Sequence, residues 1–157
     1  MRMKVLGCGN LLSHDEGVGI HALRIMKEGM LPPQVELVEV GKPGVDFLAA
    51  IKNSDFLIVI DATAQGIKPP GTVHRFEITS RNMEKTLGKT IHGFNLVVPL
   101  KALGRQSKKL PPIILLAMEI KERTLFGVGL SPQVRTGLEY LLDMAWHEIN
   151  SGLEGAD

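Results

Sequence analysis

Three residues of this chain supply acid and imidazole groups at positions where an α/β sheet would present them to a ligand. Glu16 follows an apolar run and a polar turn, whereas Asp61 directly follows a second apolar run. His92 lies in a loop just before a helical pattern. Two carboxylates and an imidazole suit a divalent transition metal that keeps an open coordination position. The same groups can carry out acid–base hydrolysis. Because the residues are far apart in sequence, only the fold can bring them together.

Each of these residues also has a purely structural explanation. Asp15 is a suitable N-cap for the helix that follows it, and Glu16 in the first turn favours the helix dipole. Asp61 is compatible with a turn aspartate that bonds to nearby backbone N–H groups. A single loop histidine such as His92 is usually an ordinary, partly exposed residue. The sequence alone leaves these alternatives open.

Apolar runs alternate with helical patterns along the chain. Strands are predicted at residues 4–8, 35–40, 56–60, 72–78 and 112–118. Helices are predicted at 16–28, 44–51 and 95–104 and from Pro132 onward, and the polar segment 79–90 is expected to be a loop. This order predicts an α/β fold with a mostly parallel, five-stranded twisted sheet and helices on both faces, in three α/β/α layers. One domain is expected over residues 1–157, with 151–157 as a loose tail.

The predicted topology decides which acids can meet. In open α/β sheets, ligands bind beyond the carboxyl ends of the strands. Asp15 and Glu16 follow the first predicted strand, and Asp61 follows the third. We therefore expect these acids at the same edge of the sheet.

Composition limits the classes of partner. The formal net charge is +1, from 18 basic and 17 acidic residues, and no basic block stands out, so nucleic acid is not an expected partner. No run approaches the roughly 20 apolar residues of a membrane span, so membrane insertion is not expected. The single cysteine, Cys8, cannot form an internal disulfide, which fits a reducing cytoplasm. Its position at the end of a buried strand favours a structural thiol over a nucleophile.

Several segments together resemble a known family. Gly7-Cys8-Gly9-Asn10-Leu11-Leu12, followed by Asp15-Glu16-Gly17-Val18-Gly19, resembles the opening motif of the hydrogenase maturation endopeptidases. Further matches follow in the family's order: the loop Gly41-x-x-Gly44, the strand end Ile58-Val59-Ile60-Asp61-Ala62, His92 ahead of Leu96, and the turn from Gly127 to Pro132. The resemblance spans nearly the whole chain, from Met3 to Ile149.

The resemblance implies a hydrolase of the protease class that acts in hydrogenase maturation. Such enzymes remove a C-terminal peptide from the large-subunit precursor of a nickel–iron hydrogenase after nickel insertion. It also implies that Glu16, Asp61 and His92 are metal ligands and catalytic residues. The nickel would be recognised on the substrate rather than held permanently. Either this ion activates the water, or a carboxylate acts as the base, as in an aspartyl protease. Asp15 and Asp61 are the candidate bases.

Two functions from other classes remain as alternatives. A nickel-binding or docking chaperone for the hydrogenase precursor would use the same three ligands without cutting the chain. A nucleotide-binding domain would use Gly7 and Gly9, but the third glycine of the dinucleotide fingerprint is replaced by Leu12. The substrate tail is expected to bind in an extended form, either added to a sheet edge or in a groove lined by residues 41–44 and the loop after Asp61.

Overall fold

The structure, a computed structural model, describes residues 1–41, 46–107, 109–121 and 127–156. Its elements in chain order are β1 (Met3–Cys8), η1 (His14–Gly17), α1 (Val18–Lys27), β2 (Val35–Val40), α2 (Phe47–Ile51), β3 (Phe56–Thr63), β4 (Val73–Ile78), α3 (Met83–Leu87), η2 (Gly93–Leu96), α4 (Val97–Ser107), β5 (Ile113–Glu119) and α5 (Pro132–Glu154), where η denotes a 3-10 helix. Gly44, which the sequence assigned to the substrate groove, lies outside the described residues.

One five-stranded sheet forms the centre of the fold, with strand order β2-β1-β3-β5-β4. The pairs β1–β2, β1–β3 and β3–β5 are parallel, and only the edge strand β4 runs antiparallel to its neighbour β5. The predicted α/β fold with a mostly parallel sheet is confirmed. Every residue of β3 after Phe56 is buried, which explains why this strand is so continuously apolar.

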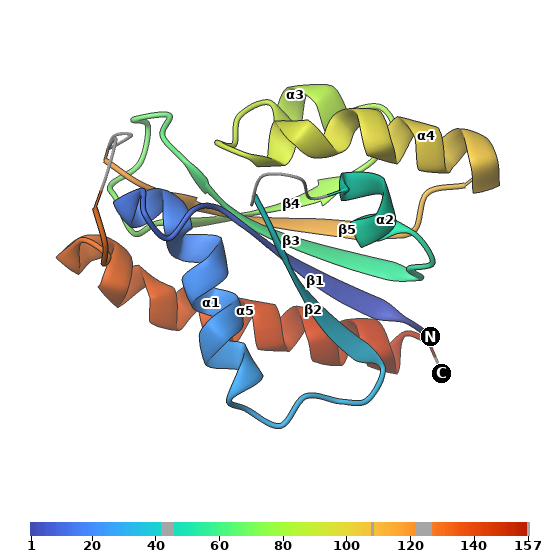
Figure 1. The fold of residues 1–157 in the computed structure, drawn as a ribbon, viewed down its shortest axis with the longest axis horizontal. Helices are drawn as coiled ribbons and strands as arrows, with labels where there is room; N and C mark the ends of the chain where they lie inside the picture. Colours follow the sequence, from blue (N-terminus) through green and yellow to red (C-terminus); the bar gives the residue numbers. More distant parts are fainter. Residues whose placement is uncertain (42–45, 108, 122–126, 157) are drawn as a thin grey trace.

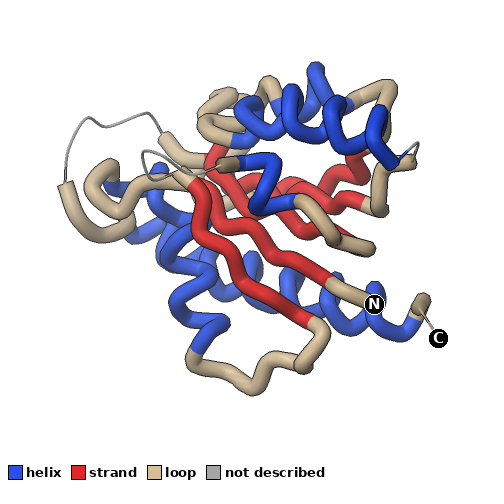
Figure 2. Tube along the Cα trace, turned by 45° about the vertical axis from the view of Figure 1, so that its right-hand side comes forward, coloured by secondary structure: helices blue, strands red, loops and turns tan. Residues whose placement is uncertain are grey.

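Helices cover both faces of the sheet, so the expected three layers are present (Figure 1). On one face, Val5, Ile58 and Leu116 pack with residues of α1 and α5 such as Leu23 and Leu141. The opposite face packs against α2, α3 and α4. Figure 2 shows the strands as one continuous layer between the two sets of helices.

The side chains of a strand alternate between these two faces. In β3, Leu57 and Val59 belong to the cluster beneath α2–α4, so Asp61 points to the same side. Ile58 and Ile60 face α1 and α5 instead. The alternation therefore directs the Asp61 carboxylate toward the layer that contains His92.

The third strand is longer than the sequence predicts. The sequence placed Asp61 after a strand ending at residue 60, but β3 continues through Thr63. Asp61, Ala62 and Thr63 pair in register with residues 117–119 of β5. The sequence predicts that the strand stops before this carboxylate. In the structure the carboxylate finds its hydrogen-bond partners in His92 and Gly93, so the pairing of β3 with β5 continues past it.

Two helical predictions also change. Residues 16–28 do not form one helix: Glu16 lies in η1, and α1 begins at Val18. The segment 79–90, expected to be a loop, contains α3. Thr79 and Asn82 exchange side-chain to backbone hydrogen bonds of 2.8 and 3.3 Å ahead of α3, and Met83 and Leu87 bury one face of its single turn.

The last helix is longer than expected. Residues 151–157 were expected to be a loose tail, but α5 continues to Glu154. Leu153 packs against the core cluster that contains Met3 and Ile149, which gives the last turn an apolar contact that holds it on the sheet. No helix among the described residues is long and apolar enough to cross a membrane.

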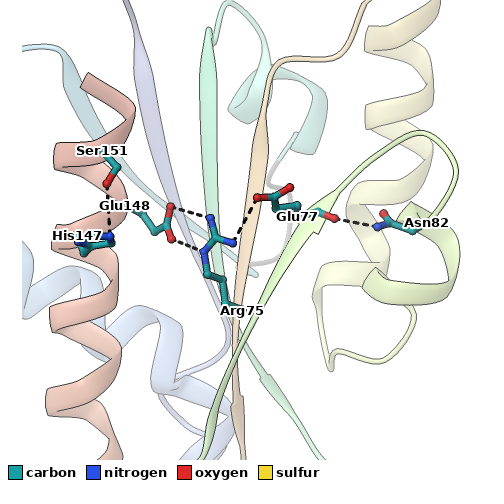
Figure 3. Close-up of polar contacts among 6 residues, drawn as sticks. All are labelled: Arg75, Glu77, Asn82, His147, Glu148 and Ser151. Carbon is teal, nitrogen blue, oxygen red and sulfur yellow. Dashed lines mark hydrogen bonds and ion pairs between the residues drawn. The ribbon is translucent and has the colours of Figure 1, made fainter. Parts of the chain in front are cut away.

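An ion pair between Arg75 and Glu148 connects the edge strand β4 to α5. Figure 3 shows Arg75 between Glu148 of α5 and Glu77 of its own strand. The guanidinium donates to both carboxylate oxygens of Glu148, and that carboxylate is 8% exposed against 41% for the Arg75 side chain. This contact lies on the sheet face opposite to Asp61, so it supports the scaffold rather than the candidate site.

Candidate active site at the carboxyl edge of the sheet

Asp61 is fully buried in the central strand and is bonded to a segment 31 and 32 residues away in the sequence. Its Oδ2 accepts hydrogen bonds from the backbone N–H groups of His92 and Gly93, each at 2.7 Å. Its Oδ1 lies 3.2 Å from Nδ1 of the His92 ring. The carboxylate thus holds both the backbone and the side chain of His92.

These backbone N–H groups are free because a helix starts there. His92 is the N-cap residue of η2, and the first N–H groups of a helix have no partner within it. Asp61 supplies that partner from β3 and places negative charge at the positive end of the helix. The structural alternative, an aspartate that bonds to backbone N–H groups, is therefore met in part. The N–H groups belong to His92 and Gly93 rather than to the turn after Asp61.

The His92 ring has one nitrogen engaged. Its side chain is 20% exposed, and Nδ1 faces Asp61. When Nδ1 carries the hydrogen and donates a hydrogen bond to Asp61, the free lone pair of the ring is on Nε2. A carboxylate on one ring nitrogen is the arrangement that orients metal-binding imidazoles. The His92 side chain can therefore serve as a ligand or a base through Nε2.

Glu16 lies at the same edge, in η1, and is 5% exposed. The chain approaches the sheet closely here, because a Cβ on Gly19 would overlap the carbonyl oxygens of Cys8 and Ile60. This contact seats the start of α1 against the carboxyl ends of β1 and β3, as the topology rule predicts.

The three candidate ligands do not form a ready metal site. In the described part of the chain, no group of three or more His, Cys, Asp and Glu side chains is arranged to hold a metal ion. The structure joins Asp61 to His92 directly and places Glu16 at the same edge. A metal bound by all three would need further ligands or side-chain movement.

Asp15 is neither the cap of its own helix nor a freely available acid. Its Oδ1 accepts the backbone N–H of Ser131 and its Oδ2 accepts the Ser131 hydroxyl, both at 2.7 Å. Ser131 is the N-cap residue of α5, so Asp15 is tied to the start of the last helix rather than capping the first. η1 itself has no side-chain cap hydrogen bond.

Cys8 has the properties of a structural thiol. It is 0% exposed, and burial, followed by the nearby Asp61 charge, raises its pKa well above the ordinary value of 9.0. A thiol that stays protonated is a poor nucleophile. This environment favours the structural interpretation of Cys8 that the sequence suggested.

Sequence reasoning missed one buried acid at this edge. Glu119 ends β5 opposite Thr63, on the same face as Asp61, and is 1% exposed. Its Oε1 lies 3.3 Å from His74 Nε2, and its Oε2 has no hydrogen-bond partner among the described residues. An acid at the end of an apolar strand was the signal that identified Asp61, and the same signal was present at Glu119.

Comparison with known proteins identifies the family. A profile described as "hydrogenase maturation protease" matches residues 20–148. The chain is 30% identical over 156 residues to the hydrogenase 2 maturation protease of Escherichia coli (strain K12), covering 98% of this chain and 94% of that protein. It is 33% identical over 148 residues to the hydrogenase expression/formation protein HupD of Thiocapsa roseopersicina, and this match spans 90% of the chain but 64% of HupD.

A solved structure supports the same assignment. The hydrogenase maturating endopeptidase HybD from E. coli matches with a TM-score of 0.84 at 28% sequence identity, covering 97% of this chain and 94% of that one. Fold, order of motifs and sequence identity over almost the full length agree. The chain therefore belongs to the hydrogenase maturation protease family and is a hydrolase of the endopeptidase class.

Proposed function

We propose that this protein removes a C-terminal peptide from the large-subunit precursor of a nickel–iron hydrogenase after nickel has been inserted. The observation that carries the proposal is the contact between Asp61 and His92 at the carboxyl edge of the sheet, where α/β enzymes bind their ligands. Membership of the maturation protease family supports the substrate class. A cytoplasmic location is part of the proposal, in keeping with the single, reduced cysteine.

In this proposal the nickel ion belongs to the substrate. Two carboxylates and an imidazole are suitable donors for a divalent transition metal. The precursor would bring the ion together with part of its coordination shell. Glu16, Asp61 and His92 would then contact an ion that is already held, so cleavage would depend on nickel loading.

The hydrolysis itself requires that a water attack the scissile carbonyl. A bound cation polarises that carbonyl and lowers the pKa of the water, and a neighbouring base removes the proton. Both oxygens of Asp15 are engaged by Ser131, which makes it a poor candidate for this base. Both oxygens of Asp61 are engaged as well, by His92 and Gly93, so Asp61 would act on a proton through the His92 ring that it orients.

The route of the substrate tail is part of the same proposal. A cavity of about 540 Å³ lies between the loop after β3 and α5. Pro70 and Gly71 of the loop and Tyr140 of α5 line it. That cavity involves the α5 side of the sheet, whereas Asp61 points to the other side. This cavity is therefore not part of the proposed route, and the extended tail would instead add to an edge of the sheet.

The deciding experiment is to mix the protein with nickel-loaded and nickel-free precursor and to follow the precursor mass. A mass loss equal to a C-terminal peptide, seen only with the loaded precursor, is the expected result. Glu16→Gln and His92→Ala should each abolish the loss. An unchanged precursor that nevertheless binds the protein would mean that the protein is a docking or nickel-binding chaperone.

A further inference from the structure

The Asp15 carboxylate links two segments that are distant in the sequence. It accepts two hydrogen bonds of 2.7 Å from Ser131, 116 residues away, and is 9% exposed. We propose that Asp15 is a positioning residue, whose contact with Ser131 holds η1 and thereby Glu16 in place for the reaction. This inference rests on the proposed function, since it concerns the site at which the precursor would be cut.

Backbone contacts join the same two segments, 12–15 and 127–131, which we call the clamp. The N–H of Gly127 donates to the carbonyl of Leu12 at 2.8 Å, and the N–H of His14 donates to the carbonyl of Gly127 at 3.1 Å. Ser13 and Gly127 form an isolated parallel bridge. The clamp therefore combines backbone bonds between residues 12–14 and Gly127 with the side-chain bonds between Asp15 and Ser131.

His14, within the clamp, adopts an uncommon backbone conformation. Its φ is +48°, in the left-handed region, which side-chain-bearing residues rarely adopt. Its ring fills the space beside Gly127, where a Cβ would overlap it, and Gly127 has a φ of +147°. Strained backbone of this kind persists only where surrounding contacts over-determine it, and it is concentrated at functional sites.

The position of Asp15 explains how the clamp reaches the site. Asp15 directly precedes Glu16 in η1, a 3-10 helix with no side-chain cap of its own. The two bonds to Ser131 tie this short element to a long helix. A shift of η1 would displace Glu16 relative to the Asp61–His92 pair, and displacements of about 1 Å can reduce the rate of an enzyme on the order of 10²-fold.

The chemistry of the contact distinguishes positioning from proton transfer. An asparagine at this position can still accept the Ser131 N–H through its carbonyl and can donate its amide to the Ser131 hydroxyl, which rotates to accept. It cannot act as a base or supply a negative charge. Asp15→Asn therefore keeps the clamp and removes the acid, whereas Asp15→Ala removes both.

The test measures cleavage of nickel-loaded precursor and, separately, hydrogen exchange of the Ser131 amide. Asp15→Ala should expose that amide to exchange and lower the cleavage rate on the order of 10²-fold. Asp15→Asn should keep the amide protected, stay within about threefold of the wild-type rate and leave the pH–rate profile unchanged. Asp55→Ala is the matched control, because Asp55 also accepts a backbone N–H, that of Arg2 at 2.7 Å, but directly precedes β3, at the opposite end of that strand from Asp61.

The outcomes separate the two hypotheses. If Asp15→Asn loses as much activity as Asp15→Ala while the amide stays protected, the charge is essential and Asp15 is a base or a ligand. If Asp15→Ala cleaves at the wild-type rate, the clamp does not position Glu16. If the wild-type protein itself does not cleave, the proposed function fails, and unchanged exchange in Asp15→Ala would separately overturn the clamp.

Discussion

Asp61 holds His92 by two kinds of bond at once. One oxygen of the buried carboxylate accepts the backbone N–H of His92 at 2.7 Å, and the other lies 3.2 Å from Nδ1 of its ring. The same residue thus fixes where the histidine sits and how its ring is turned. A ring oriented in this way leaves Nε2 on the side away from Asp61.

Asp61→Asn should separate the structural from the chemical part of this contact. The asparagine carbonyl can keep the bonds to the N–H groups of His92 and Gly93, which leaves its amide group facing Nδ1. The ring must then accept at Nδ1, and its proton moves to Nε2. We expect cleavage to fall on the order of 10²-fold or more while the free energy of unfolding changes by about 1 kcal/mol.

Nitrogen NMR of the His92 ring would report the tautomer directly. Asp61→Ala is a poorer probe, because the carboxylate is buried and its loss leaves two backbone N–H groups without a partner. It should cost about 2 kcal/mol or more of stability, so the three site residues cannot all be replaced by alanine without consequence for the fold. Full activity of Asp61→Asn would show that cleavage does not depend on a His92 ring protonated at Nδ1.

Stability should depend on pH through His21. Burial, followed by the charge of Arg24, lowers the pKa of this imidazole from 6.5, and Asp15 opposes the shift. Its Nε2 is buried without a hydrogen-bond partner among the described residues. The unfolded chain therefore binds the proton more readily than the folded one, so stability falls as the pH drops from 6.5 toward the lowered pKa of the folded state.

Urea unfolding at about pH 7.5 and about pH 5.5 measures this effect. The wild-type protein should lose more stability on acidification than a His21→Asn variant, which cannot titrate. Equal losses in the two proteins would show that His21 does not contribute to the pH dependence.

Cys8 should resist modification in the native state. Because burial raises its pKa, the reactive thiolate is scarce at neutral pH, and the folded protein should not react with a thiol reagent that labels it fully in denaturant. Cys8→Ala should retain cleavage and cost about 1 kcal/mol of stability from the lost packing. Rapid labelling of native protein together with loss of cleavage would instead indicate a nucleophile.

The Arg75–Glu148 pair should respond asymmetrically to substitution. Arg75→Ala leaves a carboxylate that is 8% exposed without its partner, whereas Glu148→Ala leaves a guanidinium that is already 41% exposed. We expect Arg75→Ala to cost about 2 kcal/mol and Glu148→Ala about 1 kcal/mol, less than a fully buried pair because water reaches Arg75. Denaturant unfolding of both variants would measure the difference.

Neither variant should change the rate of precursor cleavage, because the pair lies on the sheet face opposite to Asp61. A larger cost for Glu148→Ala than for Arg75→Ala would contradict this argument. Loss of cleavage in a variant that remains folded would place β4 and α5 in the substrate path.

The sequence by itself determined the fold class and most of the candidate residues. Apolar runs and helical periodicity are local, and they predicted the parallel sheet, its two helical layers and the edge at which Glu16 and Asp61 lie. The prediction failed where a short element depended on contacts rather than on pattern, as in α3, which is held by Thr79, Asn82 and two buried apolar side chains.

Only the tertiary structure decided which partners each candidate residue contacts. Asp61 finds its partners 31 and 32 residues away, and Asp15 finds Ser131 at a separation of 116 residues. No local pattern encodes such pairs, because a carboxylate accepts any N–H or O–H that folding brings within reach. For the same reason Asp15, which the sequence offered as a helix cap or a base, instead bonds to Ser131, the N-cap residue of the last helix.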